Sequence, residues 1–402
     1  MSFPGQHWQR RTWLAWLLWP VSLVYVLLVG LRRAWYRRHS ARNPNRANRR
    51  QPGLREPGPR EPGPREPGPR RPGLKHDADP TMTGRGLASP PVIVVGNISV
   101  GGTGKTPLTA WLVGELQAAG WSPGIVSRGH GGEHARSADA SSCLRVTPDS
   151  EVMQVGDEPL MLARATGAPM AICRRRALAV AALAESGEVD VIVADDGLQH
   201  YAMARDIELL VVDGVRGFGN GFCLPAGPLR EPASRLADFP RVVVQLPPDA
   251  LSDPAASLHP SIASLRNRAG PIAAFALETG NLRQLGLAAH AEPVHALAGI
   301  GDPERFFTAL ESQGLTVIRH PFPDHHGYTP ADLPTDDTRP ILVTSKDAVK
   351  LHALDLDKAL RERILEVPVT LVASAGLLRL REDLLHALAL PAKPSASTKI
   401  QP

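Results

Sequence analysis

The sequence has 402 residues, of which 43% are apolar, so it is long enough and hydrophobic enough to form two folded domains. Its net charge is +5, but residues 1–90 carry 17 basic and 5 acidic side chains, whereas the remaining residues carry 28 and 35. An acidic folded part argues against nucleic acid as a partner. Cys143, Cys173 and Cys223 form no C-x-x-C pair, so the cysteines indicate neither a zinc site nor a disulfide framework.

The N-terminal segment at 12–31 reads TWLAWLLWPVSLVYVLLVGL and has about the length of a helix that spans a bilayer. Arginines flank it, and the larger cluster follows it, which predicts that the rest of the chain is cytoplasmic. A spanning anchor, a helix that lies in the membrane interface and a cleaved signal peptide are three interpretations. The signal peptide is disfavoured because no small-residue cleavage site follows. We expect a membrane-associating helix within residues 1–40.

Residues 41–89 form a low-complexity segment that contains the repeat REPGP. A segment so rich in proline, glycine and arginine has almost nothing to bury, so we expect an extended or disordered linker.

The stretch SVGGTGKTP at 99–107 follows an apolar, β-branched run and precedes a segment with helical spacing. A glycine-rich loop between a strand and a helix is typical of a phosphate-binding P-loop, because the loop N–H groups and the helix N-terminus cradle the anion. The strict pattern has glycine at the position of the serine, but the double glycine and the flanking elements favour the same site. The nucleotide-binding residues predicted here are Ser99, Gly101, Gly102, Thr103, Gly104, Lys105 and Thr106.

A second apolar run, at 190–197, ends in Asp195 and Asp196. An acidic residue at the end of a strand is the Walker B arrangement, which places a carboxylate beside the Mg²⁺ that the P-loop threonine binds. Adjacent side chains of an extended chain point to opposite sides, so the two carboxylates have different roles. We predict Thr106 and Asp195 as metal ligands. Asp196 is expected to orient Asp195, bind a second ion or cap the turn.

Further apolar runs alternate with helical segments, which predicts an α/β fold with a P-loop NTPase-type parallel sheet over 90–239. The pattern restarts after residue 239. We expect a second, smaller α/β domain over 240–390, followed by a disordered tail at 391–402.

Seven motifs in their order and spacing closely resemble the tetraacyldisaccharide 4'-kinases, which are the lipid A 4'-kinases of Gram-negative bacteria. The motifs are VVGNISVGGTGKTP, SRGHGG, VGDEPLMLA, DDGLQH, GNGFCLPAGPLREP, FPDHHGYT and TSKDAVKL. The resemblance covers residues 90–355 and the hydrophobic N-terminal segment. It implies an enzyme that transfers the γ-phosphate of ATP to the 4'-hydroxyl of a tetraacylated glucosamine disaccharide 1-phosphate, with ATP and Mg²⁺ as cofactors. It also implies a location at the cytoplasmic face of the inner membrane, because a multiply acylated substrate stays in the bilayer.

The resemblance also implies roles for residues outside the P-loop. Asp157 of the GDE motif is expected to be the general base or part of an acid pair at the acceptor, and His325 of the DHH motif to support it as an Asp–His dyad. Lys105, Asp195 and Asp196 complete the predicted catalytic set. Contacts to substrate or phosphate are expected from Arg128, Glu158, Gln199 and Arg230.

The chain departs from the family pattern at two positions. His130 stands where the family usually has an aromatic residue, and Ser345 replaces the acidic residue of the TEKDAVK motif. The competing hypothesis is a membrane-tethered regulatory ATPase or GTPase, which shares the P-loop and the paired aspartates. It does not account for DHHGYT or LPAGPLREP, and the sequence has no N-K-x-D motif for guanine.

Overall fold

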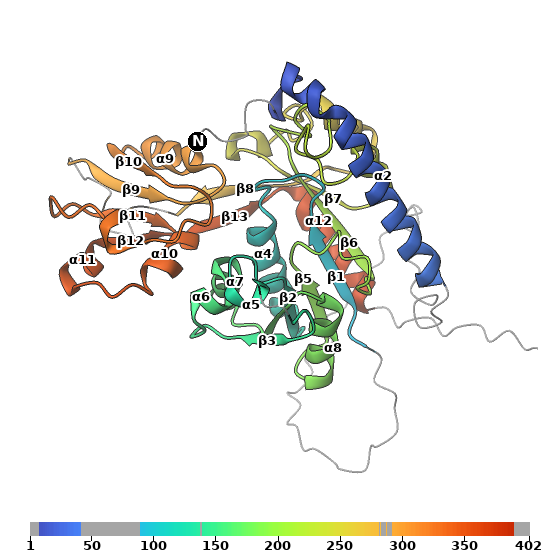
Figure 1. Cartoon of the computed structure of the whole chain (residues 1–402), viewed down its shortest axis with the longest axis horizontal. Coiled ribbons are helices and arrows are strands. Elements are labelled where there is room, and N and C mark those ends of the chain that lie inside the picture. The colour runs from blue at the N-terminus through green and yellow to red at the C-terminus, as the bar shows by residue number, and fades with distance from the viewer. Residues whose placement is uncertain are drawn as a thin grey trace, which may run out of the picture.

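The computed structural model describes residues 8–41, 89–136, 139–280 and 292–389, together with residues 282 and 287. A nine-stranded sheet and a four-stranded sheet organise this part of the chain (Figure 1). The predicted α/β fold class is confirmed. Apart from residues 41 and 89, the predicted linker and tail lie outside the described residues.

The larger sheet has the strand order β13-β8-β7-β6-β1-β5-β2-β4-β3. Its neighbouring strands run parallel, except that the edge strands β3 and β13 are antiparallel to β4 and β8. The strand bounds are β1 Val92–Gly96, β2 Pro123–Ser127, β3 Cys143–Val146, β4 Met170–Cys173, β5 Val191–Ala194, β6 Ile207–Asp213, β7 Val242–Gln245, β8 Ala273–Thr279 and β13 Val369–Ala373.

Helices cover both faces of this sheet. Val92 and Val94 of β1 pack into the cluster on one face, and Ile93 and Val95 pack into the cluster on the other. Burial on both faces is typical of central parallel strands. One face is covered by α4 (Lys105–Ala118), α7 (Asp157–Thr166) and α12 (Ala375–Ala389), and the other by α8 (Arg176–Ser186) and segments of 3-10 helix. The remaining short elements of this part are α5 Glu133–Arg136, α6 Val152–Val155, η1 Ala233–Asp238, η2 Pro248–Leu251 and η3 Pro260–Asn267.

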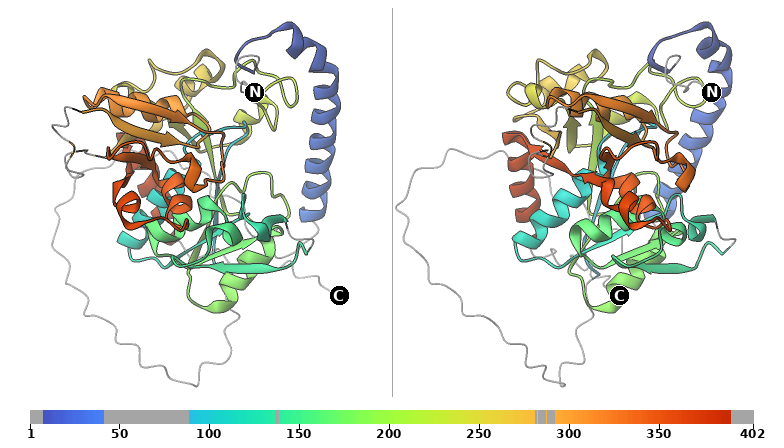
Figure 2. Two further views of the ribbon diagram at one scale, coloured as in Figure 1. Left: turned by 60° about the vertical axis from the view of Figure 1, so that its left-hand side comes forward. Right: turned by 90° about the vertical axis from the view of Figure 1, so that its left-hand side faces the viewer.

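The smaller sheet is entirely parallel, in the order β10-β9-β11-β12, and lies beside the larger one (Figure 2). One apolar cluster joins it to α9, and a second joins it to α10 and α11. The bounds are β9 Val294–Ala298, α9 Pro303–Ser312, β10 Val317–Pro321, η5 Pro330–Asp332, β11 Ile341–Thr344, α10 Ser345–Leu351, α11 Lys358–Arg363 and β12 Ile364–Val367.

The division between the sheets does not coincide with the predicted boundary at residue 239. β7 and β8 extend the larger sheet, and after β12 the chain returns to it with β13 and α12. The smaller sheet therefore occupies only 294–367. The reason is strand pairing: β13 forms five residue pairs with β8, and local hydrophobic patterns do not reveal which strand becomes the neighbour of which.

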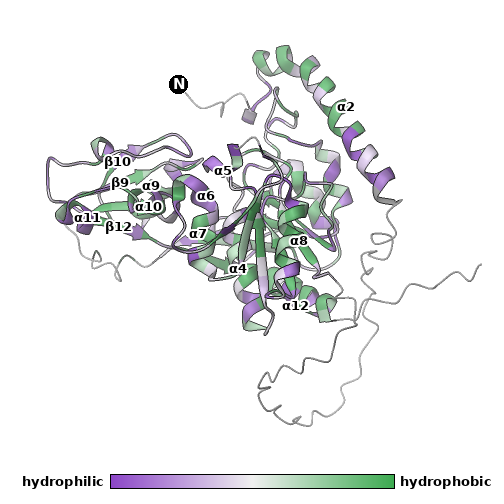
Figure 3. Ribbon diagram, turned by 60° about the horizontal axis from the view of Figure 1, so that its bottom comes forward, coloured by the Kyte–Doolittle hydropathy of each residue, from purple (hydrophilic) through white to green (hydrophobic). Residues whose placement is uncertain are grey.

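The N-terminal helix α2 (Trp13–Ala41) lies along one side of the larger domain (Figure 1). The buried Ser22 hydroxyl donates a hydrogen bond to the carbonyl of Cys223 at 2.9 Å, and Arg33 forms an ion pair with Asp238 at 2.6 Å. Within the part of the chain that the structure describes, Trp13–His39 is the one helix long and apolar enough to cross a membrane. Its apolar surface gives way to polar residues at the C-terminal end (Figure 3). The exposed apolar side chains include Trp13, Trp16, Leu17, Val21, Leu23, Val24, Leu27, Leu28 and Leu31.

Candidate active site

The predicted P-loop lies between β1 and α4. Gly101 and Gly104 have φ of 103° and 76°, in the left-handed region that favours glycine. A Cβ at Gly104 would approach the Phe275 ring to 2.7 Å, so this position also lacks room for a side chain. Ser99 forms a β-bridge with Leu229, and the N–H of the next residue donates to the carbonyl of Pro228 at 2.8 Å. The loop is therefore held by the 228–229 segment at the position where the strict motif has glycine.

The P-loop lysine faces the second of the paired aspartates. Nζ of Lys105 lies 3.7 Å from Oδ1 of Asp196, and Nη1 of Arg230 lies 3.1 Å from both Asp196 carboxylate oxygens. Burial acts to raise the pKa of Asp196, but Lys105 and Arg230 outweigh it and lower that pKa to about 2. Asp196 therefore carries its charge at neutral pH and neutralises two cations that an incoming phosphate would contact.

The first of the paired aspartates has the environment of a metal ligand. Asp195 is fully buried, accepts a hydrogen bond from Thr109 at 2.9 Å and lies 3.5 Å from the Thr106 hydroxyl. Burial, with Glu158 and Asp196 nearby, raises the pKa of Asp195 to about 7. A bound cation would stabilise the ionised form of Asp195 and so offset the unfavourable burial of its charge. Mg²⁺ prefers oxygen ligands and is commonly bound by one or two protein groups plus phosphates, so Thr106 and Asp195 fit this ion.

Asp157 and His325 form a close pair. Nδ1 of His325 lies 3.1 and 3.2 Å from the two Asp157 carboxylate oxygens. The Asp157 side chain is 4% exposed, and that of His325 is 26% exposed. The hydrogen bond to Asp157 raises the pKa of His325, although burial and Lys346 oppose the shift. Burial acts against the ionised form of Asp157, yet His325 and two lysines lower its pKa.

Two site residues have strained backbones. Among the described residues, Asp196 (φ 48°) and His325 (φ 59°) are the non-glycine residues with positive φ. Backbone strain of this kind concentrates at functional sites, where the surrounding structure holds it in place. Both residues belong to the catalytic set that the sequence predicts.

The SRGHGG loop packs directly against the dyad. A Cβ at Gly131 would lie 3.6 Å from Oδ1 of Asp157, and one at Gly156 would lie 2.3 Å from the carbonyl oxygen of His130. The rings of His130 and His325 meet edge to face, with centroids 5.0 Å apart. His130 thus provides an aromatic contact to the dyad at the position where the chain departs from the family pattern.

The dyad and the P-loop border the same space. A Cβ at Gly301, in the loop after β9, would lie 3.6 Å from Oδ2 of Asp324 and 3.8 Å from the Gly102 nitrogen. The DHH loop of the smaller domain and the P-loop of the larger domain therefore lie on either side of Gly301. The GDE and DHH motifs, which are far apart in sequence, come together at this contact between the domains.

Helix α10 contributes two lysines for which the sequence suggested no role. Nζ of Lys346 lies 3.3 Å from Nε2 of His325, 2.9 Å from Asp324 and 3.3 Å from Glu158. Nζ of Lys350 lies 3.7 Å from Oδ2 of Asp157. The TSKDAVKL motif was the available signal, since its lysines are four residues apart and share one face of a helix.

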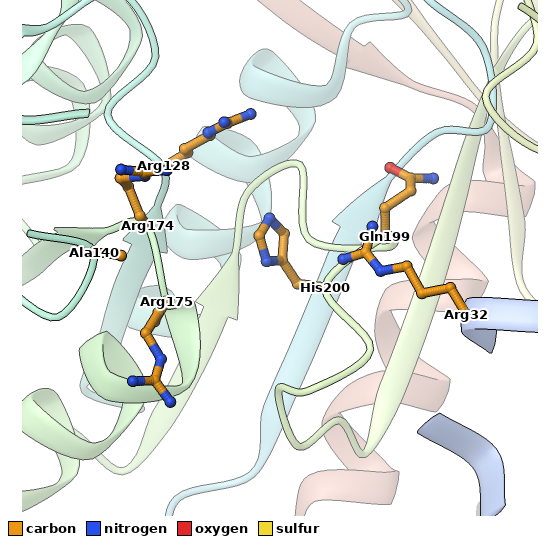
Figure 4. Close-up of a pocket in the computed structure, with 7 residues that line it drawn as sticks. All are labelled: Arg32, Arg128, Ala140, Arg174, Arg175, Gln199 and His200. Atoms are coloured by element: carbon orange, nitrogen blue, oxygen red, sulfur yellow. The ribbon is translucent and has the colours of Figure 1, made fainter. Parts of the chain in front are cut away.

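A strongly basic cavity of about 420 Å³ lies between α2 and the ends of β2 and β4 (Figure 4). It brings together the predicted residues Arg128 and Gln199, whereas Glu158 lies beside the dyad and Arg230 beside the paired aspartates. Arg128, Arg174 and Arg175 lie on one side of His200, and Arg32 lies on the other (Figure 4). Burial and Arg176 lower the pKa of His200 to about 3, so the ring is neutral. The lining residues that sequence reasoning missed are Arg32, Ala140, Arg174, Arg175 and His200.

These features define a class of protein. A P-loop with its lysine, a Walker B aspartate at the end of a neighbouring parallel strand, and an Asp–His pair facing them are the elements of a P-loop phosphotransferase. The basic cavity adds a second concentration of positive charge.

Comparisons with known proteins narrow this class to one family. A family model described as tetraacyldisaccharide-1-P 4'-kinase matches residues 77–388. The chain is 51% identical to the tetraacyldisaccharide 4'-kinase of Alkalilimnicola ehrlichii over 273 residues, which is 67% of this chain and 76% of the relative. It is 41% identical to that of Chromobacterium violaceum over 378 residues, which is 92% of this chain and 94% of the relative. The chain therefore belongs to the tetraacyldisaccharide-1-P 4'-kinase family, as its motifs predicted, and is an enzyme of the kinase class.

A solved structure agrees with the fold. The LpxK of Aquifex aeolicus, described as an "apo" form in complex with ATP, matches with a TM-score of 0.62. The match covers 93% of this chain and 99% of that chain at 21% sequence identity. The similarity extends to nearly the whole length of both chains, so the two-sheet arrangement is common to them.

Proposed function

We propose that this chain transfers the γ-phosphate of ATP to the 4'-hydroxyl of a tetraacylated glucosamine disaccharide 1-phosphate, in lipid A biosynthesis. The observation that carries the proposal is the Asp157–His325 dyad, which faces a complete P-loop across the contact between the two domains. A nucleotide switch needs only the P-loop and the paired aspartates. A dyad poised to take a proton indicates an acceptor hydroxyl.

The loop backbone from Ser99 to Thr106 would hold the nucleotide phosphates, with Lys105 beside them. Thr106 and Asp195 would hold Mg²⁺, which would supply charge neutralisation for the transferred group. Arg230 lies beside Asp196 and is placed to contact the same phosphates. These groups position the phosphate and offset its developing charge, which are the main contributions of a protein to phosphoryl transfer.

The geometry favours His325 as the proton acceptor. Asp157 is buried, and its oxygens face His325, the N–H of Glu158 and Lys350. Because Nδ1 of His325 is directed at that carboxylate, Nδ1 carries the proton and Nε2 has the lone pair. The acceptor oxygen attacks the γ-phosphorus, its proton passes to Nε2, and ADP leaves. Asp157 then orients the ring and stabilises the imidazolium, in place of the general-base role expected for it from sequence.

The basic cavity fits the 1-phosphate of the acceptor. Arg128, Arg174 and Arg175 line one side of it, and Arg32 of α2 lines the other (Figure 4). Guanidinium groups bind phosphate through paired, charge-assisted hydrogen bonds. Because Arg32 belongs to the membrane-associating helix, the cavity lies where the headgroup of a bilayer lipid could enter.

We further propose that α2 lies in the membrane interface at the cytoplasmic face of the inner membrane. Contacts with the folded domain extend from Trp8, which precedes the helix and whose indole N–H donates to the Pro225 carbonyl, to Tyr36, whose ring centroid lies 6.2 Å from that of Tyr201. A helix held along one side in this way has only its other side available to lipid. Its exposed leucines and tryptophans are the side chains that insert to a depth of roughly 5–10 Å in such helices.

The test is an assay with the full chain in detergent micelles, Mg²⁺, γ-labelled ATP and a tetraacyl disaccharide 1-phosphate. We expect the label in a bisphosphorylated lipid, with one ADP formed per lipid. ATP turnover without labelled lipid would instead support the regulatory switch.

A further inference from the structure

Lys346 connects the two domains at the active site. It lies in the first turn of α10, on the smaller domain, and its side chain is 14% exposed. Its ammonium group lies 3.3 Å from Glu158 of α7, on the larger domain, and 2.9 Å from Asp324 in the DHH loop. Its third neighbour is Nε2 of His325, at 3.3 Å.

In the contact between Lys346 and His325, the donor and the acceptor of the hydrogen bond can be assigned. A lysine ammonium group has donors only, so Nε2 must be the acceptor and therefore unprotonated. Nδ1 keeps the ring proton because it faces the carboxylate of Asp157. The two partners together hold the ring in one orientation and one neutral tautomer, with its lone pair directed toward Lys346.

The other charges around His325 act in the opposite direction. Asp157 from α7 and Asp324 from the same loop favour the imidazolium form, and Glu158 adds a third carboxylate behind Lys346. His130, from the loop after β2, meets the ring edge to face, and burial lowers the pKa of His130. Lys350 acts on Asp157. Lys346 is thus the cation in direct contact with the ring, among three carboxylates that would otherwise favour its protonation.

We propose that Lys346 is a positioning residue for phosphoryl transfer, which keeps Nε2 of His325 unprotonated and oriented until the acceptor hydroxyl takes its place. The proposal rests on the function proposed above, in which Nε2 accepts the hydroxyl proton. When the acceptor enters, Lys346 retains Glu158 and Asp324 as partners and does not need to leave the site. Before the acceptor binds, the positive charge of Lys346 also opposes protonation of the His325 ring by solvent.

The experiment measures kcat/KM for lipid phosphorylation from about pH 5.5 to 9.5 in the full chain, with Lys346→Met and Lys346→Arg. Removing a charge in direct contact shifts a pKa by about one unit or more, so the acidic limb for Lys346→Met should move upward by about one pH unit. Well below this limb the variant should lose about tenfold, and the loss should shrink as the pH rises, so that near pH 9 the variant approaches the wild type. Lys346→Arg should keep the wild-type profile. The control is Lys358→Met in α11, whose side chain is 89% exposed.

A second readout does not depend on catalysis. Titration of His325 by NMR in histidine-labelled protein without ATP or acceptor, assigned with His325→Gln, should show an apparent pKa about one unit higher in Lys346→Met than in wild type. An equal loss of activity at every pH, with an unchanged His325 titration, would overturn the proposal. Absence of lipid phosphorylation by the wild type would refute the proposed function alone, and the titration would still decide the role of Lys346.

Discussion

Nδ1 of His325 lies 3.1 Å from Oδ2 of Asp157, although the two residues are 168 positions apart and belong to different domains. Asp157 starts a helix that covers the larger sheet, and His325 lies in a loop after β10 of the smaller one. The active site therefore depends on how the two sheets are placed together.

Substitution of the dyad should remove catalysis and leave nucleotide binding intact. General-base catalysis contributes about 100-fold to 10,000-fold, so we expect losses in this range for His325→Gln, and a comparable loss for Asp157→Asn because the ring tautomer is no longer held. ATP affinity, measured by calorimetry, should change little. The matched control is His326→Gln, whose ring contacts Asp332 and Phe322 instead of the dyad. If both histidine variants lost activity equally, the role of His325 as proton acceptor would be wrong.

The dyad should also contribute stability that depends on pH. The lowered pKa of Asp157 contributes stability above about pH 4 that is lost as the pH falls, and the raised pKa of His325 contributes stability below about pH 6.5 that is lost as the pH rises. His325→Gln should therefore lower the free energy of unfolding most between about pH 4.5 and 6, and least above about pH 8. Urea denaturation at both ends of this range, with His326→Gln as control, measures the effect. A difference that did not vary with pH would contradict this assignment.

Two glycines separated by ten positions should respond oppositely to alanine. Gly104 has φ of 76° and would place a Cβ 2.7 Å from the Phe275 ring, so Gly104→Ala should destabilise the protein by about 1–3 kcal/mol and weaken ATP binding. Gly114, in the middle of α4, has nothing within 4 Å of its Cβ position. Gly114→Ala should stabilise by about 0.5–1 kcal/mol. Thermal melts with and without Mg-ATP test both, and destabilisation by Gly114→Ala would show that α4 is packed differently.

The basic cavity should determine affinity for the phosphate already present on the acceptor. A hydrogen bond to a charged group contributes about 1.5–3 kcal/mol, so Arg175→Gln should raise KM for the 1-phosphorylated acceptor about tenfold or more. KM for ATP should be unchanged. Arg145→Gln, which breaks an ion pair with Glu188 outside the cavity, is the control. Wild type and Arg175→Gln should act equally on an acceptor that lacks the 1-phosphate. A retained difference would mean that the cavity binds another part of the substrate.

The exposed side of α2 should control membrane binding. Leu17 and Leu28 are 66% and 60% exposed, and replacing both with glutamate puts two charges on the side directed at lipid. Sedimentation with anionic vesicles should fall about tenfold or more, because each buried leucine contributes about 1.5–3 kcal/mol. ATP affinity should stay the same. Val369→Glu, at an exposed position of β13, is the control. Undiminished vesicle binding by the double variant would show that α2 is not the membrane contact.

The local parts of this protein could be predicted from sequence. The P-loop needs a strand, two glycines with positive φ, a lysine and a helix start within a short segment, and all of these lie between Val92 and Ala118. The α/β class follows from alternating strand and helix patterns for the same reason, since each pattern is contained in its own segment. The motifs also identified Asp157 and His325, and with them the family.

The tertiary structure decided what depends on distant segments. β7, β8 and β13 join the larger sheet because of their pairing partners, which local hydrophobicity does not encode. The proposal that His325 and not Asp157 takes the proton rests on the burial of Asp157 and the partial exposure of His325, which no local sequence pattern gives. The cavity arginines come from α2 and from the ends of β2 and β4. Lys346 contacts Nε2 of His325 from a different element of the smaller domain, and it also contacts Glu158 of the larger domain. Burial, pKa and proton transfer are properties of neighbours in space, so the roles of these residues follow from the packing of the two sheets and not from any one segment.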